Sequence, residues 1–481
     1  MELLKLEDYQ DLESRKVIEY FGEISKIPRK SGEERQIREY LEMFAKKRNL
    51  EYIKDEYENI IIYKKATKGR ENEETLAFQA HTDMICEKDV GIEHDFSKDP
   101  ILLYKEGDYI TAKGTTLGAD NGIGVAYMLA LLDSDISIPN LECIFTVQEE
   151  TTMIGAIKID EKNIQSRKII SLDNGKEGKI LISSANCNEW IGRLEANKES
   201  VDFNKEFYRL YYGNFLGGHS GGNIGDERRG NPIKLAMEVL KEIPNIQIVK
   251  LIGGSRVNVI PREFEVQFCI MDNENLVENK ILETIQKQKE IFDKETIEFK
   301  RLEVNEKQKI KDVYSMKMSR IIIDFINAYK NGALKRDEKK NVLLSANLAV
   351  LTEYDEGIQI EFSERSNKKE LEQKYLEELT KLIKEYNINI IWHQELKGVE
   401  KKENNELLEK CQKVYQKIYN NPMEEVVSQG VVEGGFFTDK MPDCEYVCIG
   451  PDSYDVHSPK ERVSISSIER VWKYLKEIIK D

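Results

Sequence analysis

The segment from Thr75 to Gly178 repeats one arrangement, in which an apolar run or a Gly-rich turn ends at an acid or a histidine. In an open α/β sheet the carboxyl ends of neighbouring parallel strands meet at one crevice, so side chains far apart in the sequence lie close together there. We therefore expect one site assembled from several strand ends. The residues at these ends are His81 with Asp83, then Asp120, then Glu149 with Glu150, and then Asp173.

The apolar patterns around this segment predict an α/β fold. Short apolar runs predict buried strands at 59–66, 75–80, 141–148, 168–174 and 445–450. Apolar residues at helical spacing predict helices at 13–27, 33–47, 125–132 and 406–419. The alternation of strands and helices indicates a mostly parallel sheet with helices on both faces.

Local signals predict how two helices begin and where a turn lies. Ser31 and Glu34 form an S-x-x-E pattern at the start of the second helix, and Ser466 and Glu469 form the same pattern at the last helix. Each pattern is typical of a capping box, in which the two side chains bind the first free backbone N–H groups. The segment 430–437, GVVEGGFF, predicts a Gly-rich turn.

The length of 481 residues exceeds what one core usually supports, so we expect two domains. From about Asn188 the chain becomes rich in Lys and Glu, and the pattern of site residues stops until about residue 430. We expect the site to lie in a discontinuous domain formed by 1–187 and 401–481, interrupted by an inserted α+β domain at 188–400. The order helix, strand, strand, helix, strand occurs twice in the insertion, which predicts two similar halves.

Composition argues against several classes of partner. A net charge of −16 disfavours nucleic acid, which needs clustered Lys and Arg. No run of about 18 apolar residues predicts a membrane span, and the start MELLKLEDYQDLESRK lacks the features of a signal peptide. The 7 cysteines are scattered, which suits reduced thiols in a cytosol, and Cys444 with Cys448 predicts one buried strand rather than a metal clip.

The strand-end side chains suit a metal site. A neutral histidine with several carboxylates is typical of sites for zinc, manganese or cobalt. Asp83 lies two residues after His81, so on an extended chain its carboxylate can hold the imidazole in one tautomer. If two cations bind about 3.5–4 Å apart, a carboxylate must bridge them, and Asp120 on its tight turn is best placed. Of Glu149 and Glu150, one can bind metal while the other acts as a base.

Surface or purely structural roles are the alternatives for these residues. Any one of these acids, taken alone, is typical of a solvated surface charge, but several at strand or turn ends indicate a site. The Gly-rich turn at 115–124 contains neither G-x-G-x-x-G nor G-K-[ST], so it does not predict a phosphate cradle. His94 in a charged loop is interpreted as solvated, and His393 at a predicted strand end is interpreted as structural.

Six motifs resemble the M20 family of metallopeptidases. They are AHTDMICEK, GTTLGADNGIG, VQEETTMIGA, SLDNGKEG, LGGHSGGNIG and VHSP. The forms HTDMICEK and SLDNGKEG resemble the branch called aminoacyl-histidine dipeptidase or cytosolic non-specific dipeptidase. The resemblance covers nearly the whole chain and implies a peptidase catalytic domain interrupted by an inserted lid.

The resemblance also implies a role for each site residue. Glu149 would be the general base, Asp83 would orient His81, and the bond between Asp120 and Asn121 would be cis. His219 in GGHSGG matches the lid histidine that polarises the scissile carbonyl and stabilises its oxyanion. The implied metal ligands are His81, Asp120 as the bridge, Glu150, Asp173 and His457. Weaker implied substrate contacts are Asn258, Asn347 and Arg365 in the lid, and Glu433, Gly434 and Gly435 at the pocket floor.

Some positions depart from this branch. Gln429 stands where a histidine is usual, and Asn223 follows GGHSGG where an acid is usual. The stretch IWHQELKG replaces a segment that usually contains proline and tryptophan. These differences leave the implied metal ligands in place and put the substrate preference in question.

Together these inferences predict a two-metal dipeptidase for Xaa-His-like or varied dipeptides, acting by attack of a metal-bridging hydroxide on the peptide carbonyl. The expected cofactors are two divalent ions, Zn²⁺ first, with Mn²⁺ or Co²⁺ as alternatives. A tripeptide aminopeptidase or N-acyl amino-acid deacylase on the same scaffold is the nearest alternative, and a non-catalytic peptide- or metal-binding protein is the alternative from another class. We expect a cytoplasmic monomer or homodimer, and the sequence leaves open whether His219 acts in its own chain or across a dimer.

Overall fold

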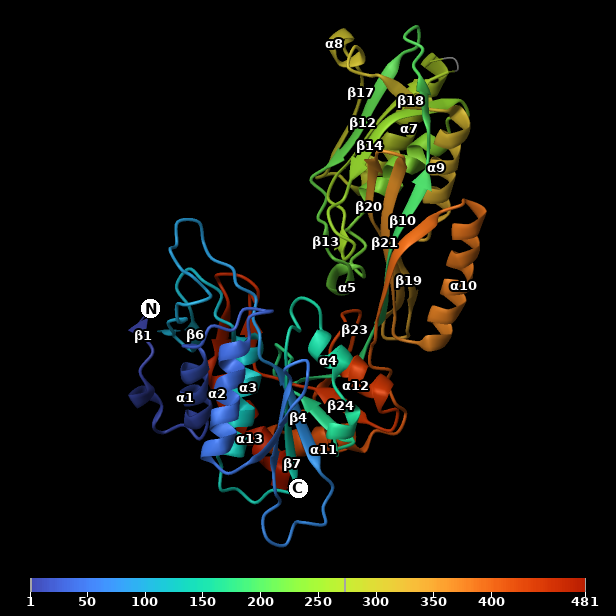
Figure 1. Cartoon of the computed structure of the whole chain (residues 1–481). Coiled ribbons are helices and arrows are strands. Elements are labelled where there is room, and N and C mark those ends of the chain that lie inside the picture. The colour runs from blue at the N-terminus through green and yellow to red at the C-terminus, as the bar shows by residue number, and fades with distance from the viewer. Residues whose placement is uncertain (1, 272–273, 481) are drawn as a thin grey trace. The chain divides into compact units, whose positions relative to one another are not determined.

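The computed structural model describes residues 2–271 and 274–480, which form two compact units (Figure 1). The first unit comprises Met1–Ser183, Gly398–Val426 and Val432–Asp481, and the second comprises Ser184–Lys397 and Val427–Val431. Each unit encloses a large hydrophobic core of its own. In the described part of the chain, no helix combines the length and apolar character that a membrane crossing requires.

An eight-stranded sheet runs through the first unit. Its central pairs are parallel, namely β7 with β4, β4 with β8, and β8 with β24. The pairs β2–β3, β3–β7 and β24–β9 toward its margins are antiparallel. The predicted α/β class with a parallel sheet at its centre is therefore confirmed. In spatial order the strands are β2 (Glu51–Lys54), β3 (Ile60–Lys64), β7 (Leu141–Thr146), β4 (Leu76–His81), β8 (Lys168–Ser171), β24 (Glu445–Cys448), β9 (Lys179–Ser184) and β23 (Glu424–Ser428).

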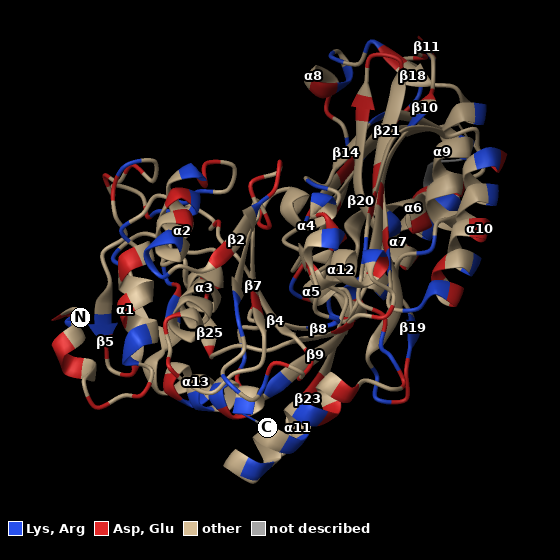
Figure 2. Cartoon of the chain, turned by 60° about the horizontal axis from the view of Figure 1, so that its bottom comes forward, with Lys and Arg blue, Asp and Glu red and all other residues tan. Residues whose placement is uncertain are grey.

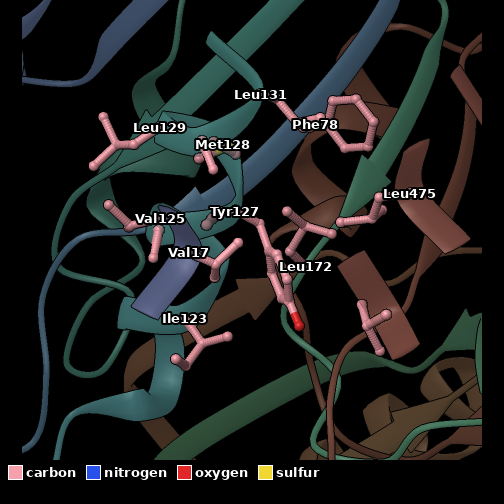
Figure 3. Close-up of a cluster of buried hydrophobic side chains, with 14 of the residues drawn as sticks. Val17, Phe78, Ile123, Val125, Tyr127, Met128, Leu129, Leu131, Leu172 and Leu475 are labelled. Carbon is pink, nitrogen blue, oxygen red and sulfur yellow. The ribbon is translucent and has the colours of Figure 1, made fainter. Parts of the chain in front are cut away.

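Helix α3 (Ala119–Leu132) is the central helix of the first unit. Every residue from Asn121 to Leu132 is buried, as expected for a helix that is apolar on all sides. Figure 3 shows its side chains beside Val17, Phe78 and Leu475, which come from α1, β4 and α13. The other helices of this unit are α1 (Arg15–Ile24), α2 (Arg35–Lys47), α4 (Ile154–Lys158), α11 (Glu406–Tyr419), α12 (Gly434–Lys440) and α13 (Ile465–Lys480).

A small second sheet ties the end of the chain to the segment before α3. Within it, β26 pairs with β6, so the residues after His457 lie beside the residues that lead to Asp120. The order of its strands is β1 (Glu2–Leu3), β5 (Tyr104–Glu106), β6 (Tyr109–Thr111), β26 (Arg462–Ser464) and β25 (Ser453–Tyr454).

The second unit is built on a nine-stranded sheet. Every strand pairing found in this sheet among the described residues is antiparallel. The strands follow the order β17 (Thr296–Arg301), β12 (Phe207–Gly213), β16 (Phe264–Ile270), β14 (Ile246–Gly253), β20 (Val342–Tyr354), β21 (Gly357–Ser366), β10 (Asn186–Glu195) and β22 (Asn389–Leu396), with β19 (Gly332–Arg336) paired to β20. The short strand pairs are β11 (Lys198–Ser200) with β18 (Asp312–Tyr314), and β13 (Gly218–His219) with β15 (Val259–Ile260).

The helices of the second unit follow the predicted order along the chain. Helix α6 (Pro232–Lys241) precedes β14 and β16, and α7 (Glu274–Ile291) precedes β17. Helix α9 (Met316–Ala328) precedes β20 and β21, and α10 (Lys369–Glu385) precedes β22. The interpretation of this order as a duplication stays a prediction. The two short helices are α5 (Ser220–Asn223) and α8 (Val304–Lys307).

Helix α10 shows how the charged composition of this unit is accommodated. Its buried residues Glu372, Tyr375 and Leu379 are three and four residues apart, which places them on one face. Figure 2 shows the blue ribbon of Lys residues and the red ribbon of Glu residues alternating along this helix. Helix α10 is therefore amphipathic, with one buried face and one charged face.

Both predicted capping boxes are wrong. Helix α2 begins at Arg35, and Glu34 accepts hydrogen bonds from the backbone N–H groups of Gly32 and Gln148 at 3.0 Å each. Ser31 instead lies 2.8 Å from the hydroxyl of Thr151. Gln148 and Thr151 belong to a distant segment that a local pattern does not reveal.

The last helix differs in the same way. It begins at Ile465, and Ser466 lies inside it, where its N–H and hydroxyl donate to Asp108 at 3.1 and 2.6 Å. Glu469 accepts from the backbone N–H of Ser14 at 2.8 Å. The Gly-rich segment near 430–437 also differs from the expected turn, because Gly434 begins helix α12.

The seven cysteines are all free. Cys448 ends the buried strand β24 and Cys444 directly precedes it, as the strand interpretation of this pair predicted. No potential metal-binding group among residues 2–271 and 274–480 includes a cysteine.

Candidate metal centre

Three parallel strands deliver side chains to one edge of the first-unit sheet. Strand β4 ends at His81, which pairs in register with Thr146 at the end of β7. Glu149 and Glu150 follow β7 by three and four residues, and Asp173 follows the end of β8 by two. Because β7, β4 and β8 are adjacent and parallel, their carboxyl ends share one edge, and the predicted convergence of these side chains is what the structure shows.

Asp120 reaches the same edge from a sharp turn at the start of α3. Gly118 has a φ of 70°, which favours glycine, and the backbone of Asp120 and Asn121 departs from helical geometry. The peptide bond between Asp120 and Asn121 is cis. This turn places Asp120 Oδ1 3.1 Å from Nε2 of His81 and Oδ2 3.4 Å from Nε2 of His457.

His457 comes from a loop near the end of the chain. Its Nε2 lies 3.0 Å from a carboxylate oxygen of Glu150. The ring is half-exposed, whereas His81 is only 1% exposed. The two histidines therefore approach Asp120 from the two sides of its carboxylate.

These residues form two overlapping groups of potential ligands. One group contains His81, Asp120 and Asp173, and the other contains Asp120, Glu150 and His457. Within each group the candidate ligand atoms lie within 4.8 Å of one another. Asp120 belongs to both, as a bridging carboxylate would. Glu149 belongs to neither, although it forms a third group with His81 and Glu150.

Asp83 links two of the strand ends. Its Oδ1 lies 3.3 Å from Nδ1 of His81, and its two carboxylate oxygens accept the backbone N–H groups of Glu149 and Glu150 at 3.1 Å each. The side chain is fully buried. Burial opposes its charge, but the hydrogen bond and charge of His81, together with the hydrogen bonds from Ser31 and Glu150, hold the pKa of Asp83 below its usual value.

The acids at the centre repel one another. Burial raises the pKa of Glu149 well above its usual value against the opposing effect of His81, and the carboxylates of Asp173 and Glu150 add to the rise. Burial also raises the pKa of Asp173 to about 7, and the neighbouring carboxylate of Asp120 adds to this effect. Positive charge placed among these carboxylates would relieve the repulsion.

The two histidines are drawn toward their charged form. Hydrogen bonds to Asp120 and Glu150 raise the pKa of His457 to about 10, against the effect of burial. Burial lowers the pKa of His81, but hydrogen bonds to Asp120 and then Asp173 outweigh it and raise the value. The donor set of imidazole nitrogens and carboxylate oxygens, crowded around a shared aspartate, therefore fits two divalent cations.

His219 lies in the second unit at the N-terminus of α5. Its Nδ1 accepts hydrogen bonds from the backbone N–H groups of Gly221 and Gly222 at 3.1 and 3.2 Å. In the neutral ring the proton is therefore on Nε2, which is available as a donor. Desolvation of the ring, together with the positive charge of Arg365, lowers the pKa of His219 to about 4, so the neutral form is favoured.

The three weaker lid candidates lie around the same loop. Arg365 is buried and donates to the hydroxyl of Ser220 at 3.3 Å, and the backbone carbonyl of Asn258 accepts from the N–H of Ser220 at 2.9 Å. Asn347 donates to the carbonyl of Val259 at 2.9 Å. The structure therefore brings Arg365, Asn258 and Asn347 close to the backbone that carries His219.

The side chains at the two single-residue departures from the branch, Gln429 and Asn223, both have hydrogen-bond partners within the second unit. Gln429 accepts from the hydroxyl of Ser345 at 2.7 Å and donates to the carbonyl of Val342 at 3.0 Å. Asn223 accepts from the backbone N–H of His219 at 3.0 Å. Both amides therefore have structural partners, and Asn223 helps to hold the histidine loop.

Glu433 lies in the first unit behind His81. It is 2% exposed and accepts hydrogen bonds from Gln79 at 2.5 Å and Thr146 at 2.7 Å, which are residues of β4 and β7. Burial raises its pKa to about 8. Gly434 and Gly435 follow in α12, where Gly434 leaves room for the ring of Tyr446, which a Cβ would approach to 2.2 Å.

Sequence reasoning missed two buried charged residues beside the centre. Arg29 follows the first helix in IPRKSGEE, and Glu461 lies four residues after His457 in VHSPKERV. Each is 2% exposed. In the sequence each appears only as a charged residue next to an apolar run or a site motif. Many surface residues have the same context, so it does not indicate burial.

Comparison with known proteins places the chain among peptidases. Residues 77–481 match the model of Peptidase family M20/M25/M40. The chain is 31% identical to the cytosol non-specific dipeptidase of Escherichia coli, with 99% of each chain aligned. The structure matches the aminoacylhistidine dipeptidase of Vibrio alginolyticus with a TM-score of 0.89 and 25% identity, over 99% of this chain and 98% of that one. A tripeptidase of Staphylococcus aureus matches less closely, with a TM-score of 0.56 and 15% identity over 98% of each chain.

Proposed function

This chain belongs to the M20 metallopeptidases, and on that basis we propose that it is a dipeptidase that uses two divalent cations. The full-length likeness to dipeptidases of two bacteria supports this substrate size. The observation that carries the proposal is the pair of ligand groups that share Asp120. Zn²⁺ is the first choice of metal, with Mn²⁺ and Co²⁺ as alternatives, because the donors are imidazoles and carboxylates.

Five residues would hold the cations. His81, Asp120 and Asp173 would hold one ion, and Asp120, Glu150 and His457 would hold the other. When bound, the two ions would polarise the substrate carbonyl and lower the pKa of water. Asp83 would fix the tautomer of His81, because its carboxylate faces Nδ1 while Nε2 faces Asp120.

Glu149 is proposed as the general base. It is the acid of the strand ends that neither of the groups sharing Asp120 requires, so its carboxylate is free to accept a proton. It would take the proton of the attacking water and pass it to the leaving amine. Asp83 accepts the backbone N–H of Glu149. The residue that orients His81 therefore also holds the backbone of the proposed base in place.

His219 is proposed to donate from Nε2 to the oxygen of the scissile carbonyl as negative charge develops there. The two N–H groups on its Nδ1 fix both the tautomer and the direction of this donor. Arg365, Asn258 and Asn347 remain candidates for binding the substrate carboxylate, and Glu433, Gly434 and Gly435 for the floor of the pocket. We assign the second unit to the predicted lid at 188–400 and the first to the catalytic domain.

The alternatives predict different substrates. A tripeptide aminopeptidase would prefer tripeptides, and an N-acyl amino-acid deacylase would prefer N-acetyl amino acids. A panel of Xaa-His and other dipeptides, tripeptides and N-acetyl amino acids, tested with metal-loaded protein, separates them. Hydrolysis of none of these would favour a non-catalytic binding protein. A cytoplasmic location is proposed from the likeness to the cytosol dipeptidase.

The main test combines a metal count with hydrolysis. Glu149→Gln removes the proposed base but keeps size and shape, so kcat should fall by about 10²- to 10⁴-fold while two cations per chain stay bound. Glu142→Gln is the matched control, because Glu142 is a buried acid of β7 that belongs to none of the ligand groups. Chelation of the wild-type metals should abolish hydrolysis, and Zn²⁺, Mn²⁺ or Co²⁺ should restore it. A Glu149→Gln variant with wild-type kcat would refute the role of this residue.

A further inference from the structure

The turn that carries Asp120 is held on its N–H side by one buried carboxylate. Glu461 accepts hydrogen bonds from the backbone N–H groups of four consecutive residues, and it is 2% exposed. The bonds come from Leu117 at 2.8 Å, Gly118 at 2.9 Å, Ala119 at 2.8 Å and Asp120 at 3.2 Å. A carboxylate with this many backbone donors is fixed in place, and it fixes the turn in return.

The carbonyl side of the same turn is held by a buried arginine. Arg29 donates through Nη2 to the carbonyl of Gly118 and through Nη1 to the carbonyls of Thr82 and Asp83 at 3.3 and 3.2 Å. Its guanidinium therefore joins the Asp120 turn to the segment that follows His81. The planar fork of an arginine suits this arrangement, because its donors point in fixed directions.

Small residues make room for this arginine. A Cβ on Gly118 would approach Nη2 of Arg29 to 2.5 Å, and a Cβ on Gly122 would approach it to 2.7 Å. Gly118 and Gly122 of the motif GTTLGADNGIG therefore leave space for the guanidinium of Arg29.

The buried charge of Arg29 is stabilised by Glu461. Burial lowers the pKa of Arg29, and the negative charge of Glu461 is the largest effect that opposes this. Burial raises the pKa of Glu461, and the backbone N–H groups of the turn oppose this rise. Removing the charge of Glu461 would leave Arg29 in the interior with less compensation.

We propose that Arg29 and Glu461 are positioning residues that set the distance between His81 and Asp120, and thereby the affinity of the centre for its two cations. This inference rests on the proposed two-metal function. Asp120 must face both cations at once, so a displacement of its turn weakens both sites together. Residues behind the ligands commonly control metal affinity in this way.

The first experiment compares two matched Glu→Gln changes in the full chain. Glu461→Gln keeps the shape but turns an NH₂ group toward N–H donors that now lack an acceptor. Glu142→Gln makes the same change at a buried acid that accepts the N–H groups of Gln165 and Ser166, at 3.0 and 3.1 Å, away from the centre. Metal-depleted proteins are titrated with Co²⁺, and binding is followed by calorimetry and by the visible absorption of bound Co²⁺.

We expect Glu461→Gln to weaken Co²⁺ binding by about 10- to 100-fold and to change the Co²⁺ absorption, whereas Glu142→Gln retains the wild-type isotherm and spectrum. Near-ultraviolet circular dichroism confirms that each variant is folded. If Glu461→Gln does not fold, Arg29→Lys provides the second variant, because it keeps the charge but cannot reach the carbonyls on both segments. A wild-type isotherm for the folded Glu461 or Arg29 variant, or equal weakening by Glu142→Gln, overturns the inference.

The outcome for the wild-type chain separates this inference from the proposed function. Wild-type protein that binds two Co²⁺ ions but hydrolyses no dipeptide refutes the proposed activity and leaves the binding comparison valid. Wild-type protein that binds no Co²⁺ refutes both.

Discussion

The carboxyl of Glu364 should make the second unit less stable as pH rises. Glu364 lies on β21, is fully buried, and accepts one hydrogen bond, from the side-chain amide of Asn188 at 3.2 Å. The same amide nitrogen donates to Glu372 at 2.9 Å, so two acids share one donor. The other oxygen of Glu364 has no hydrogen-bond partner among the described residues. Burial, and then the charge of Glu372, raise the pKa of Glu364 to about 8.

The direction and size of the effect follow from this pKa. The value in the unfolded chain is 4.5, so the folded chain binds this proton more tightly. The stability that the protonated carboxyl contributes is fully present below pH 4.5 and is lost as pH rises to about 8. The interval of about 3.5 pH units, at about 1.4 kcal/mol per unit, corresponds to about 5 kcal/mol. Water that enters when the charge forms reduces this cost, and we expect a loss of about 2–5 kcal/mol.

The assay compares wild-type protein with Glu364→Gln, whose side chain stays neutral. Urea unfolding is measured from pH 5 to pH 8.5 in a Trp472→Phe background, which leaves Trp190 and Trp392 of the second unit as reporters. Glu364→Gln should gain stability relative to wild type by about 2–5 kcal/mol across this range. Glu361→Gln on the same strand is the control, because Glu361 is only partly buried.

A stability difference between wild type and Glu364→Gln that does not change with pH would refute this reasoning. So would a difference that shrinks as pH rises. A pH-dependent difference of the same size for Glu361→Gln would show that burial of Glu364 is not the cause.

Two further substitutions test one contact in the first unit and one in the second. Gly450→Ala should destabilise the first unit and weaken metal binding, because its Cβ would approach the carbonyl oxygen of Asn174 to 2.0 Å. Asn174 directly follows the proposed ligand Asp173. An unchanged Co²⁺ isotherm would contradict this prediction. Gln429→Ala should destabilise the second unit by about 1–3 kcal/mol, because it leaves the buried hydroxyl of Ser345 without its acceptor. Urea unfolding followed by the second-unit tryptophans measures this loss, and a change below about 0.5 kcal/mol would count against it.

Much of the architecture was predictable because burial leaves a periodic pattern in the chain. The helix predicted at 406–419 has those same bounds, and the strands predicted at 141–148 and 168–174 are present as β7 and β8, within a few residues. Apolar spacing reports which face of an element is buried, and this information is local. The acids and the histidine at the strand ends were predictable for the same reason, since parallel strands must bring their carboxyl ends to one edge.

The helix starts were predicted less well, because their hydrogen bonds are not local. Glu34 and Glu469 have the spacing of capping residues, but they bind the N–H groups of Gln148 and Ser14. A sequence pattern identifies a side chain that can cap a helix, but it does not show which distant N–H group that side chain binds instead.

The sequence by itself determined which side chains stand at the ends of strands and turns, because alternation and apolar runs encode local burial. Only the tertiary structure decided which oxygen of Asp120 each histidine approaches, and that Glu461 accepts four N–H groups of the turn that carries Asp120. Glu461 lies more than 340 residues from that turn along the chain, and the charge pattern around it resembles that of any surface loop. Such contacts exist only once the sheet and α3 have packed, so no local signal records them.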